Sequence, residues 1–484
     1  MSLYTSIIFL LLPTLSLLFC FSRRRKPLNS PPSPPQIPIF GNLLQLGKLP
    51  HRTLKTLADT YGPIMLLHMG YKKALVVSSS NVAREIFENH DIAVSNRVST
   101  AVTEKLLYEC KDLAAAPYSK YWKEMRAIFV SRLLSPNQVR RFHHVREEEI
   151  STMMSKIEAA GPNPVNLSDL FSIFINDVVC RVAFGKRHEA EKKKTIEVLD
   201  EATQLLGVID LAEYVPWLAW VNHFNGRNSR VEKAYQDLDF IMKQILDEHM
   251  VTKTNEDEKD FVDILLDARN EGGSIDTISV KGMIMDVFFG GTETTKTTME
   301  WIMVELLRNP EVMKKVKEEI REVIGDGETV KEEDLRRLNY TKAVIREAMR
   351  MHPAVPILPL RKTRERVEVR GYEIEEKTAV IVNVWAIAMD ATVWEEPGEF
   401  RPERFIKKGV DYLGNDFEFI PFGAGRRRCP GIAFAASVIE IGIVTLLKTF
   451  DLSSPEGKEM DVNEAGGLTV HPKSPVVIIA HPRT

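Results

Sequence analysis

Apolar residues recur along most of this chain with the spacing of one face of an α-helix. The clearest case lies between Asn309-Pro310 and Gly325, because asparagine suits the residue before a helix, proline its first turn and glycine its end. We therefore predict a helix that begins at Pro310 and ends before Gly325. Its apolar face would be formed by Val312, Val316, Ile320 and Val323.

Runs that resemble β-strands are fewer and gather in two places. One place comprises residues 65–69 and 74–78, and the other comprises residues 367–369 and 380–384, on either side of Gly371. From residue 41 onward there is no repeat, low-complexity tract or second linker, so residues 41–484 are predicted to form one catalytic domain. The predicted fold is mainly α with a small β portion.

The first 22 residues differ from the rest, because residues 3–21 carry no charge. A helix of that length reaches roughly 28 Å, about the thickness of the hydrocarbon core of a bilayer. The basic run 23–26 follows at once, whereas a cleaved signal peptide carries its positive charge before the apolar run. Residues 1–22 are therefore predicted to be one retained transmembrane helix, with the domain on the cytosolic side. Residues 23–40, basic and rich in proline, would form a stiff hinge.

Charge and cysteine content argue against several classes of protein. The net charge is −3 and the lysines and arginines are scattered, so nothing indicates a surface that binds nucleic acid. The four cysteines are far apart and have neither the spacing of a zinc site nor a need for disulfide bonds in so long a chain. Each thiol is therefore expected to be free. They are Cys20, Cys110, Cys180 and Cys429.

Cys429 lies in a loop rich in glycine and arginine, residues 422–431, with the sequence FGAGRRRCPG. Glycines allow a backbone to approach a flat ligand closely, and neighbouring arginines favour the thiolate, the form that binds metal. An apolar stretch of helical period follows, and the N-terminal end of a helix also stabilises an anion. The alternative is an incidental buried cysteine, but the residues fall in the order FxxGxRxCxG.

That order resembles the haem-binding signature of the cytochrome P-450 superfamily. The resemblance implies haem b as the cofactor and Cys429 as the fifth ligand of the iron, whose thiolate donates electron density for O–O cleavage. It also implies that Arg427 binds a haem propionate and that Phe422 shields the sulfur. The match covers essentially the whole chain, and strings such as PIFGNL, SNR and APYSKYW resemble plant A-type microsomal members, which mostly serve specialised metabolism.

A second motif, GGTET at residues 290–294, lies within a helix predicted over residues 279–307. A glycine inside a helix costs roughly 1 kcal/mol relative to alanine, so two adjacent glycines predict a local bulge beside an acid and a hydroxyl. Taken alone, Glu293 and Thr294 could equally lie on a solvated face. With the cysteine signature, the run resembles the family's oxygen-activation motif, which implies that Thr294 and Glu293 deliver protons during oxygen activation.

Arginines elsewhere complete the resemblance. Trp122 and Arg126 are one helical turn apart, so the indole N–H and the guanidinium could face one anion, and the family match assigns both to haem propionates. Arg361 is a further candidate for the propionates, and Arg97 is a weaker one.

A cluster of opposite charges is also predicted. Glu347 and Arg350 are three residues apart and share a helix face. On its own this spacing carries little information. The resemblance adds Arg404 of the PERF segment and implies an ion-pair cluster whose role is structural.

The substrate pocket is predicted from the same helix. If Thr294 faces the iron, the preceding turns place Gly290, then Asp286 or Val287, and then Met283 on that face. By analogy with the family, residues 97–118, 354–358 and 466–470 form the other walls, and Val102 and Leu106 indicate an apolar substrate. Phe288 and Phe289 are expected mainly to pack the core. The predicted substrate-binding residues are Gly290, Val287, Met283, Val355 and Leu468.

The resemblance implies a single-pass enzyme of the endoplasmic reticulum membrane that uses O2 to oxidise a small lipophilic plant metabolite such as a terpenoid, alkaloid or phenolic. NADPH would supply electrons indirectly, through NADPH-cytochrome P-450 reductase, with cytochrome b5 as a further candidate partner. The reductase would dock on positive charge from Arg426, Arg428, Lys407 and Lys408. Two alternatives are a haem-thiolate isomerase or dehydratase that needs no reductant, and a non-catalytic membrane haem protein; the Glu293–Thr294 pair argues against both.

Overall fold

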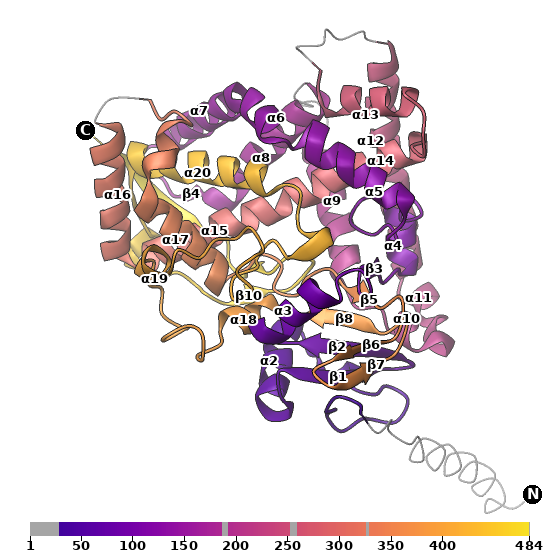
Figure 1. Cartoon of the computed structure of the whole chain (residues 1–484). Coiled ribbons are helices and arrows are strands. Elements are labelled where there is room, and N and C mark those ends of the chain that lie inside the picture. Colours follow the sequence, from indigo (N-terminus) through magenta and orange to yellow (C-terminus); the bar gives the residue numbers. More distant parts are fainter. Residues whose placement is uncertain (1–28, 186–191, 252–258, 326–328, 484) are drawn as a thin grey trace, which may run out of the picture.

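The computed structural model describes residues 29–185, 192–251, 259–325 and 329–483. The predicted transmembrane helix and the basic run lie outside the described residues. The described chain is mainly helical with a small β portion, as the sequence predicted. A large helical body lies on one side of the molecule. The five-stranded sheet and the β6-β7 pair lie on the other, with α3 and α18 between them (Figure 1).

The helices vary in length from single turns to 25 residues. In chain order the α-helices are α2 (Pro50–Tyr61), α3 (Ser80–Asn89), α4 (Ala101–Leu106), α5 (Lys120–Ile128), α6 (Pro136–Arg141), α7 (His143–Ala160), α8 (Leu167–Phe184), α9 (Lys192–Gly207), α10 (Leu211–Tyr214), α11 (Val221–Phe224), α12 (Arg227–Val251), α13 (Phe261–Asn270), α14 (Thr277–Gly291), α15 (Glu293–Arg308), α16 (Pro310–Ile324), α17 (Asn339–Met351), α18 (Val384–Ala388), α19 (Glu403–Lys408) and α20 (Ile432–Thr449).

The strands of the described chain form four sheets, of which the largest has the order β1-β2-β8-β5-β3. Three smaller sheets have the orders β4-β12-β9, β6-β7 and β10-β11. The predicted strand runs at 65–69, 74–78, 367–369 and 380–384 all lie in or overlap strands. The strands are β1 (Ile64–Met69), β2 (Lys72–Val77), β3 (Asn96–Arg97), β4 (Val165–Asn166), β5 (Arg361–Lys362), β6 (Val367–Val369), β7 (Tyr372–Ile374), β8 (Ala379–Val382), β9 (Phe450–Ser453), β10 (Glu464–Ala465), β11 (His471–Pro472) and β12 (Val477–Pro482).

The helix predicted after Asn309 is α16. Pro310 occupies its first turn, and Gly325 ends it with a φ of 83°, a conformation that glycine adopts without strain. The buried face is rotated slightly from the prediction, because Val312 and Val323 are only partly buried at its border. The residues buried on α16 are Met313, Val316, Ile320 and Ile324.

The single long helix predicted over residues 279–307 is divided into α14 and α15. Thr292 interrupts it with a ψ of −71°, and its hydroxyl donates to the Phe288 carbonyl at 2.7 Å. This break next to two glycines confirms the predicted bulge. Beyond it, α15 packs against α8, α17 and α20 in the core, so the break lies where the central helix meets the interior of the domain.

One helix in the described part of the chain, α20, is long and apolar enough to cross a membrane. More than half of its apolar window is buried inside the domain, where it packs against α7 and α15. Its apolar composition is therefore that of a core helix.

The described part of the proline-rich hinge lies against the domain. The Leu66 N–H of β1 donates to the Pro32 carbonyl at 2.8 Å, and the Asn42 amide donates to Pro35 at 3.2 Å. Pro31 and Pro34 are buried. Residues 31–35 of the predicted hinge are therefore packed against the domain, because their carbonyl groups serve as acceptors for the edge of the sheet.

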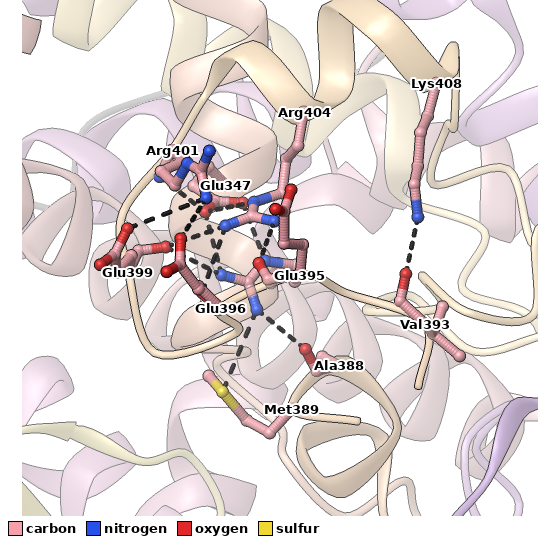
Figure 2. Close-up of polar contacts among 11 residues, drawn as sticks. Glu347, Ala388, Met389, Val393, Glu395, Glu396, Glu399, Arg401, Arg404 and Lys408 are labelled. Atoms are coloured by element: carbon pink, nitrogen blue, oxygen red, sulfur yellow. Dashed lines mark hydrogen bonds and ion pairs between the residues drawn. The ribbon is translucent and has the colours of Figure 1, made fainter. Parts of the chain in front are cut away.

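A buried ion-pair cluster joins α17 to α19, as predicted (Figure 2). Both oxygens of Glu347 accept from Arg350, at 2.8 and 2.9 Å, and Oε1 also accepts from Arg404 at 2.9 Å. The side chains of Glu347 and Arg350 have no exposed surface. Arg350 also donates to the Ala388 carbonyl at 2.8 Å, so one carboxylate fixes two guanidinium groups and the end of α18.

We predict that Glu347→Ala lowers the free energy of unfolding by roughly 3–5 kcal/mol, because it leaves a buried guanidinium without its counter-charge. Chemical denaturation followed by tryptophan fluorescence measures the change. The matched control is Asp59→Ala, which removes the exposed i,i+4 partner of Lys55 and should cost less than about 1 kcal/mol. Equal losses in the two variants would contradict a special role for the buried cluster.

Candidate active site

The Cys429 loop is held by backbone hydrogen bonds that orient the sulfur. The Cys429 N–H donates to the Phe422 carbonyl at 3.0 Å, and the Gly431 N–H donates to Cys429 Sγ at 3.3 Å. Gly423 and Gly425 have φ angles of 71° and 65°, which L residues rarely adopt. The sulfur therefore lies at the N-terminal end of α20, where an N–H group already points at it.

The charges around Cys429 differ in part from the prediction that all the neighbouring arginines favour its thiolate. Burial raises the pKa of its thiol, and the Gly431 N–H and the charges of Arg126 and Arg428 oppose that rise. Of the three arginines in the loop, Arg428 alone lowers this pKa, because Arg427 points to another part of the site. A bound metal cation would complete the stabilisation of a thiolate that these groups begin.

Arg427 is buried and holds three backbone carbonyl groups. It donates to Ser95 at 3.0 Å, to Leu113 at 3.2 Å and to Ala116 at 2.6 Å, and it stacks 4.3 Å from the ring of Trp122. Burial, followed by repulsion from Arg361, lowers the pKa of Arg427 to about 9. This guanidinium is therefore placed where positive charge is costly without an anion.

Trp122 and Arg126 lie on α5, but they do not share a partner. The N-cap of α5 is Ser119, whose hydroxyl accepts from the Trp122 N–H at 3.2 Å. The indole N–H donates to the Leu113 carbonyl at 3.0 Å, which corrects the expectation that it faces an anion. The guanidinium of Arg126 makes no hydrogen bond to any described residue, and burial lowers its pKa.

Arg361 is bound by a carboxylate that sequence reasoning missed. Asp91 accepts from Arg361 at 2.8 Å through Oδ1, and it accepts from the Arg426 N–H at 2.9 Å through Oδ2. A side chain on Gly425 would collide with the same carboxylate, 2.5 Å away. Asp91 thus ties β5 to the cysteine loop. No local pattern marks it, because its partners are some 270 and 335 residues away.

The two glycines before the Thr292 break have different surroundings. A Cβ on Gly290 would meet nothing within 4 Å, whereas a Cβ on Gly291 would lie 3.2 Å from Val179 of α8. The Thr294 hydroxyl donates to the Gly290 carbonyl at 2.7 Å. Gly290 therefore leaves open space beside a hydroxyl, and Gly291 allows close packing of two helices.

Glu293, beside this hydroxyl, has polar neighbours on two sides. Thr469 donates to its Oε1 at 3.4 Å, and Lys296 lies 3.8 Å from Oε2. Asp200 of α9 is near enough for Glu293 to contribute to its raised pKa, after the larger effect of burial. The carboxylate is only partly buried, so it has contact with both the interior and solvent.

The residues predicted to line the substrate pocket differ in how deeply they are buried. Val287, Val355 and Leu468 are partly buried, as residues that border a pocket would be. Met283 is fully buried in the core and offers no surface to a substrate, which corrects its assignment. Phe288 packs against Phe184 with ring centroids 5.0 Å apart, which confirms its packing role. The turn at 466–468 meets the end of α9.

That contact is unusually close. A Cβ on Gly207, the last residue of α9, would lie 2.2 Å from the Leu468 nitrogen. Real Cβ atoms do not approach backbone so closely, so a residue without a side chain is required here. The 466–468 turn is thereby seated directly on the end of α9.

Comparison with known proteins agrees with this geometry. The family model "Cytochrome P450" matches residues 31–479. The chain belongs to the cytochrome P450 family. It is 44% identical over 469 residues to cytochrome P450 736A117 of Prunus mume, which covers 94% of this chain and 90% of that protein. It is 43% identical to a strychnine-11-hydroxylase of Strychnos nux-vomica over 464 residues, with 93% and 91% covered.

The P450 fold is also found among solved structures. A zebrafish cytochrome P450 solved with progesterone superposes with a TM-score of 0.80 at 26% identity and covers 90% of this chain and 99% of that one. The fold and the family together imply a haem-thiolate cofactor for this chain.

The residues present fit haem. Arg97 and Arg361 are directly opposite each other across β3 and β5, and like charges in that position destabilise a sheet. Burial, followed by the charge of Arg361, lowers the pKa of both Arg97 and Arg427. Propionate groups would supply the missing negative charge. Cys429 Sγ would hold the iron, and Arg97, Arg126, Arg361 and Arg427 would hold the propionates.

Alanine substitutions at Gly290 and Gly291 should distinguish a residue that borders open space from one that allows two helices to pack closely. We predict that Gly290→Ala folds with equal or greater stability, by up to about 1 kcal/mol, because alanine is the better helix former. The added methyl group occupies the open space, so substrate-induced spectral changes should weaken for bulky ligands. Gly291→Ala should instead lower the melting temperature, because Val179 must move. Loss of stability in the first variant and not the second would contradict this assignment.

Proposed function

We propose that this P450 is a monooxygenase that inserts one oxygen atom of O2 into a small lipophilic plant metabolite. The observation that carries the proposal is the orientation of Cys429 Sγ by the Gly431 N–H, within a site whose buried arginines need anions. Haem, when bound, supplies the capacity to activate O2 and to accept electrons singly.

The protein's own residues would control protons and water. The Thr294 hydroxyl, held by the Gly290 carbonyl, can reorient to donate a proton into the open space beside Gly290. Glu293 would resupply that proton from solvent, since it is partly exposed and adjacent in sequence. These two residues favour oxygen insertion over the reductant-free isomerase or dehydratase, which needs no delivered protons.

The proposed substrate class is supported by the names of two relatives and by the apolar residues predicted to line the pocket. One relative is named strychnine-11-hydroxylase and another norfluorocurarine oxidase, the latter 42% identical over 469 residues. The partly buried walls Val287, Val355 and Leu468 are apolar. An alkaloid or a molecule of similar size and polarity is therefore the first class to test, with terpenoids and phenolics next.

Electrons would come from NADPH through a reductase with an acidic docking face, with cytochrome b5 as a second donor. Lys407 and Arg426 are exposed, although the Arg426 guanidinium also lies 3.5 Å from Asp91 Oδ2. Arg428 and Lys408 are less free, because they donate to the Leu413 and Val393 carbonyls respectively. The docking charge would thus come mainly from Lys407, with Arg426 contributing the exposed part of its guanidinium.

We further propose that the enzyme works at the endoplasmic reticulum membrane. Large apolar side chains are exposed on the 3₁₀ turn Pro216–Leu218, at the N-cap of α11 and on α11 itself. Trp217, Trp220 and Phe224 are 62%, 58% and 83% accessible. In Figure 1 this segment lies on the same side of the molecule as β1 and β2. Exposed aromatic residues of this kind suit the interface of a bilayer.

The test uses microsomes that contain the full chain and a plant reductase. We predict product formation from a panel of alkaloids, terpenoids and phenolics only when both NADPH and O2 are present. Cys429→Ser should abolish the thiolate signature in the reduced carbon monoxide difference spectrum. Turnover without NADPH or O2 would overturn the proposal in favour of the isomerase or dehydratase.

A second variant tests proton delivery. We predict that Thr294→Ala retains haem and NADPH consumption but diverts most of the electrons from product to hydrogen peroxide, because the donating hydroxyl is lost. The ratio of product to NADPH consumed is the measurement. Thr298→Ala is the control, since that hydroxyl also donates within the helix, to Thr294, but lies one turn away. A normal ratio in Thr294→Ala would remove this residue from the proposed role.

A further inference from the structure

A five-residue loop, 112–116, connects the arginines of the haem site to the central helix. On one side its carbonyl groups accept hydrogen bonds from the cofactor residues. Leu113 accepts from Trp122 and Arg427, Ala116 accepts from Arg427, and Ala114 accepts from Arg97 at 2.8 Å. The loop therefore decides where these side chains lie.

On the other side the N–H groups of the same loop are held by two aspartates. Asp286 of α14 accepts from Leu113 at 2.5 Å and from Ala114 at 3.2 Å. Asp112 accepts from Ala115 at 2.7 Å through Oδ2. The peptide groups 113–114 and 114–115 thus each lie between a carboxyl group and a guanidinium or indole, an arrangement in which the hydrogen bonds strengthen one another.

The two carboxyl groups lie close together, because they accept from the consecutive N–H groups of Leu113, Ala114 and Ala115. If both were ionised, two negative charges would be buried side by side, and neither group would have a proton to donate to the other. Asp112 is fully buried, and its Oδ1 has no partner if both groups are ionised. A single proton on the pair satisfies this oxygen and removes the repulsion.

We propose that Asp286 and Asp112 share one proton in the folded protein, and that this acid pair positions the 112–116 loop and, through it, the arginines of the haem site. Asp286 carries the proton and donates to Asp112 Oδ1, while both groups continue to accept the loop N–H groups. Asp286 and Asp112 are positioning residues in this scheme.

The surroundings of the pair support the shared proton. Desolvation, followed by the charge of Asp112, raises the pKa of Asp286 well above its usual range, and desolvation raises the pKa of Asp112 to about 6. Asp286 is only partly buried as a residue, but its carboxyl group, like that of Asp112, is packed against the 112–116 loop. The other titratable and charged groups that face the pair are Arg97, Arg427, Tyr121 and Cys110.

The proton also balances the charge of the site. Four guanidinium groups belong to the site: Arg361 pairs with Asp91, Arg97 and Arg427 lie near the acid pair, and Arg126 lies near Arg427. With one proton the pair carries one negative charge, so two positive charges remain, which equals the charge of the two propionates of haem. This charge argument rests on the proposed function, whereas the contacts of the two aspartates with the 112–116 loop do not.

Infrared spectroscopy of the holoprotein with ¹³C-labelled aspartate tests for the proton directly. We expect a carboxylic-acid C=O band at neutral pH that shifts in D2O and is lost in both Asp286→Asn and Asp112→Asn, since an amide replaces the donor or leaves its partner ionised. Asp200→Asn, which changes another aspartate of raised pKa, should retain this band. A band that is absent from the wild type, or that survives in Asp286→Asn, would overturn the proposal.

The pH dependence of unfolding gives a second measure. The folded pKa of Asp286 is raised, so its proton stabilises the fold fully below the unfolded value of about 3.9. That stability falls as the pH rises toward the folded pKa, about tenfold in the unfolding equilibrium per pH unit for one proton. Asp286→Asn should remove this slope relative to the wild type, whereas an unchanged slope would contradict the assignment.

The positioning role is tested by the rate at which haem transfers to excess apomyoglobin. Asp286→Asn retains a donor and an acceptor and should lose haem within about twofold of the wild-type rate. Asp286→Leu releases two loop N–H groups and should lose it roughly tenfold faster or more. Equal rates in the two variants would overturn the positioning role. A wild type that binds no haem would refute the proposed function but leave the infrared result to be judged on its own.

Discussion

A buried guanidinium must find oxygen atoms, and this constraint organises most of the structure around the site. Arg427 spans three carbonyl groups of two loops, Arg361 joins β5 to the cysteine loop through Asp91, and Arg350 binds α17 to the end of α18. Because leaving such a group unpaired costs several kcal/mol, each arginine fixes the segments that supply its partners. The helices give the domain its bulk, but these contacts hold the loops in register with them.

The break in the central helix is confined to a short segment beside the open space at Gly290. Two glycines and a threonine that bonds back to the preceding turn create a break between α14 and α15. On either side of the break the helix is anchored, by Asp286 to the 112–116 loop and by packing against α8, α17 and α20. The irregular turn is therefore confined to the few residues that border open space, while the rest of the helix remains rigid.

Much of this could be predicted from sequence, because the strongest signals are local. The helix from Pro310 to Gly325, the break near Gly290 and the Glu347 cluster each depend on residues close in the chain or on a motif. The partners of the arginines could not be predicted, since Asp91 and the loop carbonyls are brought to them by the fold. Trp122 was expected to face an anion and instead bonds to Leu113, because a backbone acceptor carries no sequence signal. Met283 has the correct helical spacing but the wrong depth, which depends on how neighbouring elements pack.

The contact between Gly207 and the 466–468 turn has a consequence for how such an enzyme diversifies. Because a side chain on Gly207 would collide with the backbone at Leu468, the end of α9 and the C-terminal turn are one mechanical unit, although some 260 residues of sequence separate them. A new residue in this turn can be accommodated only if the end of α9 keeps its shape. Variation in this part of the pocket would thus be inherited as linked pairs of changes, one in α9 and one in the turn. Recombination between relatives within the intervening segment would tend to separate the two changes and disrupt the contact.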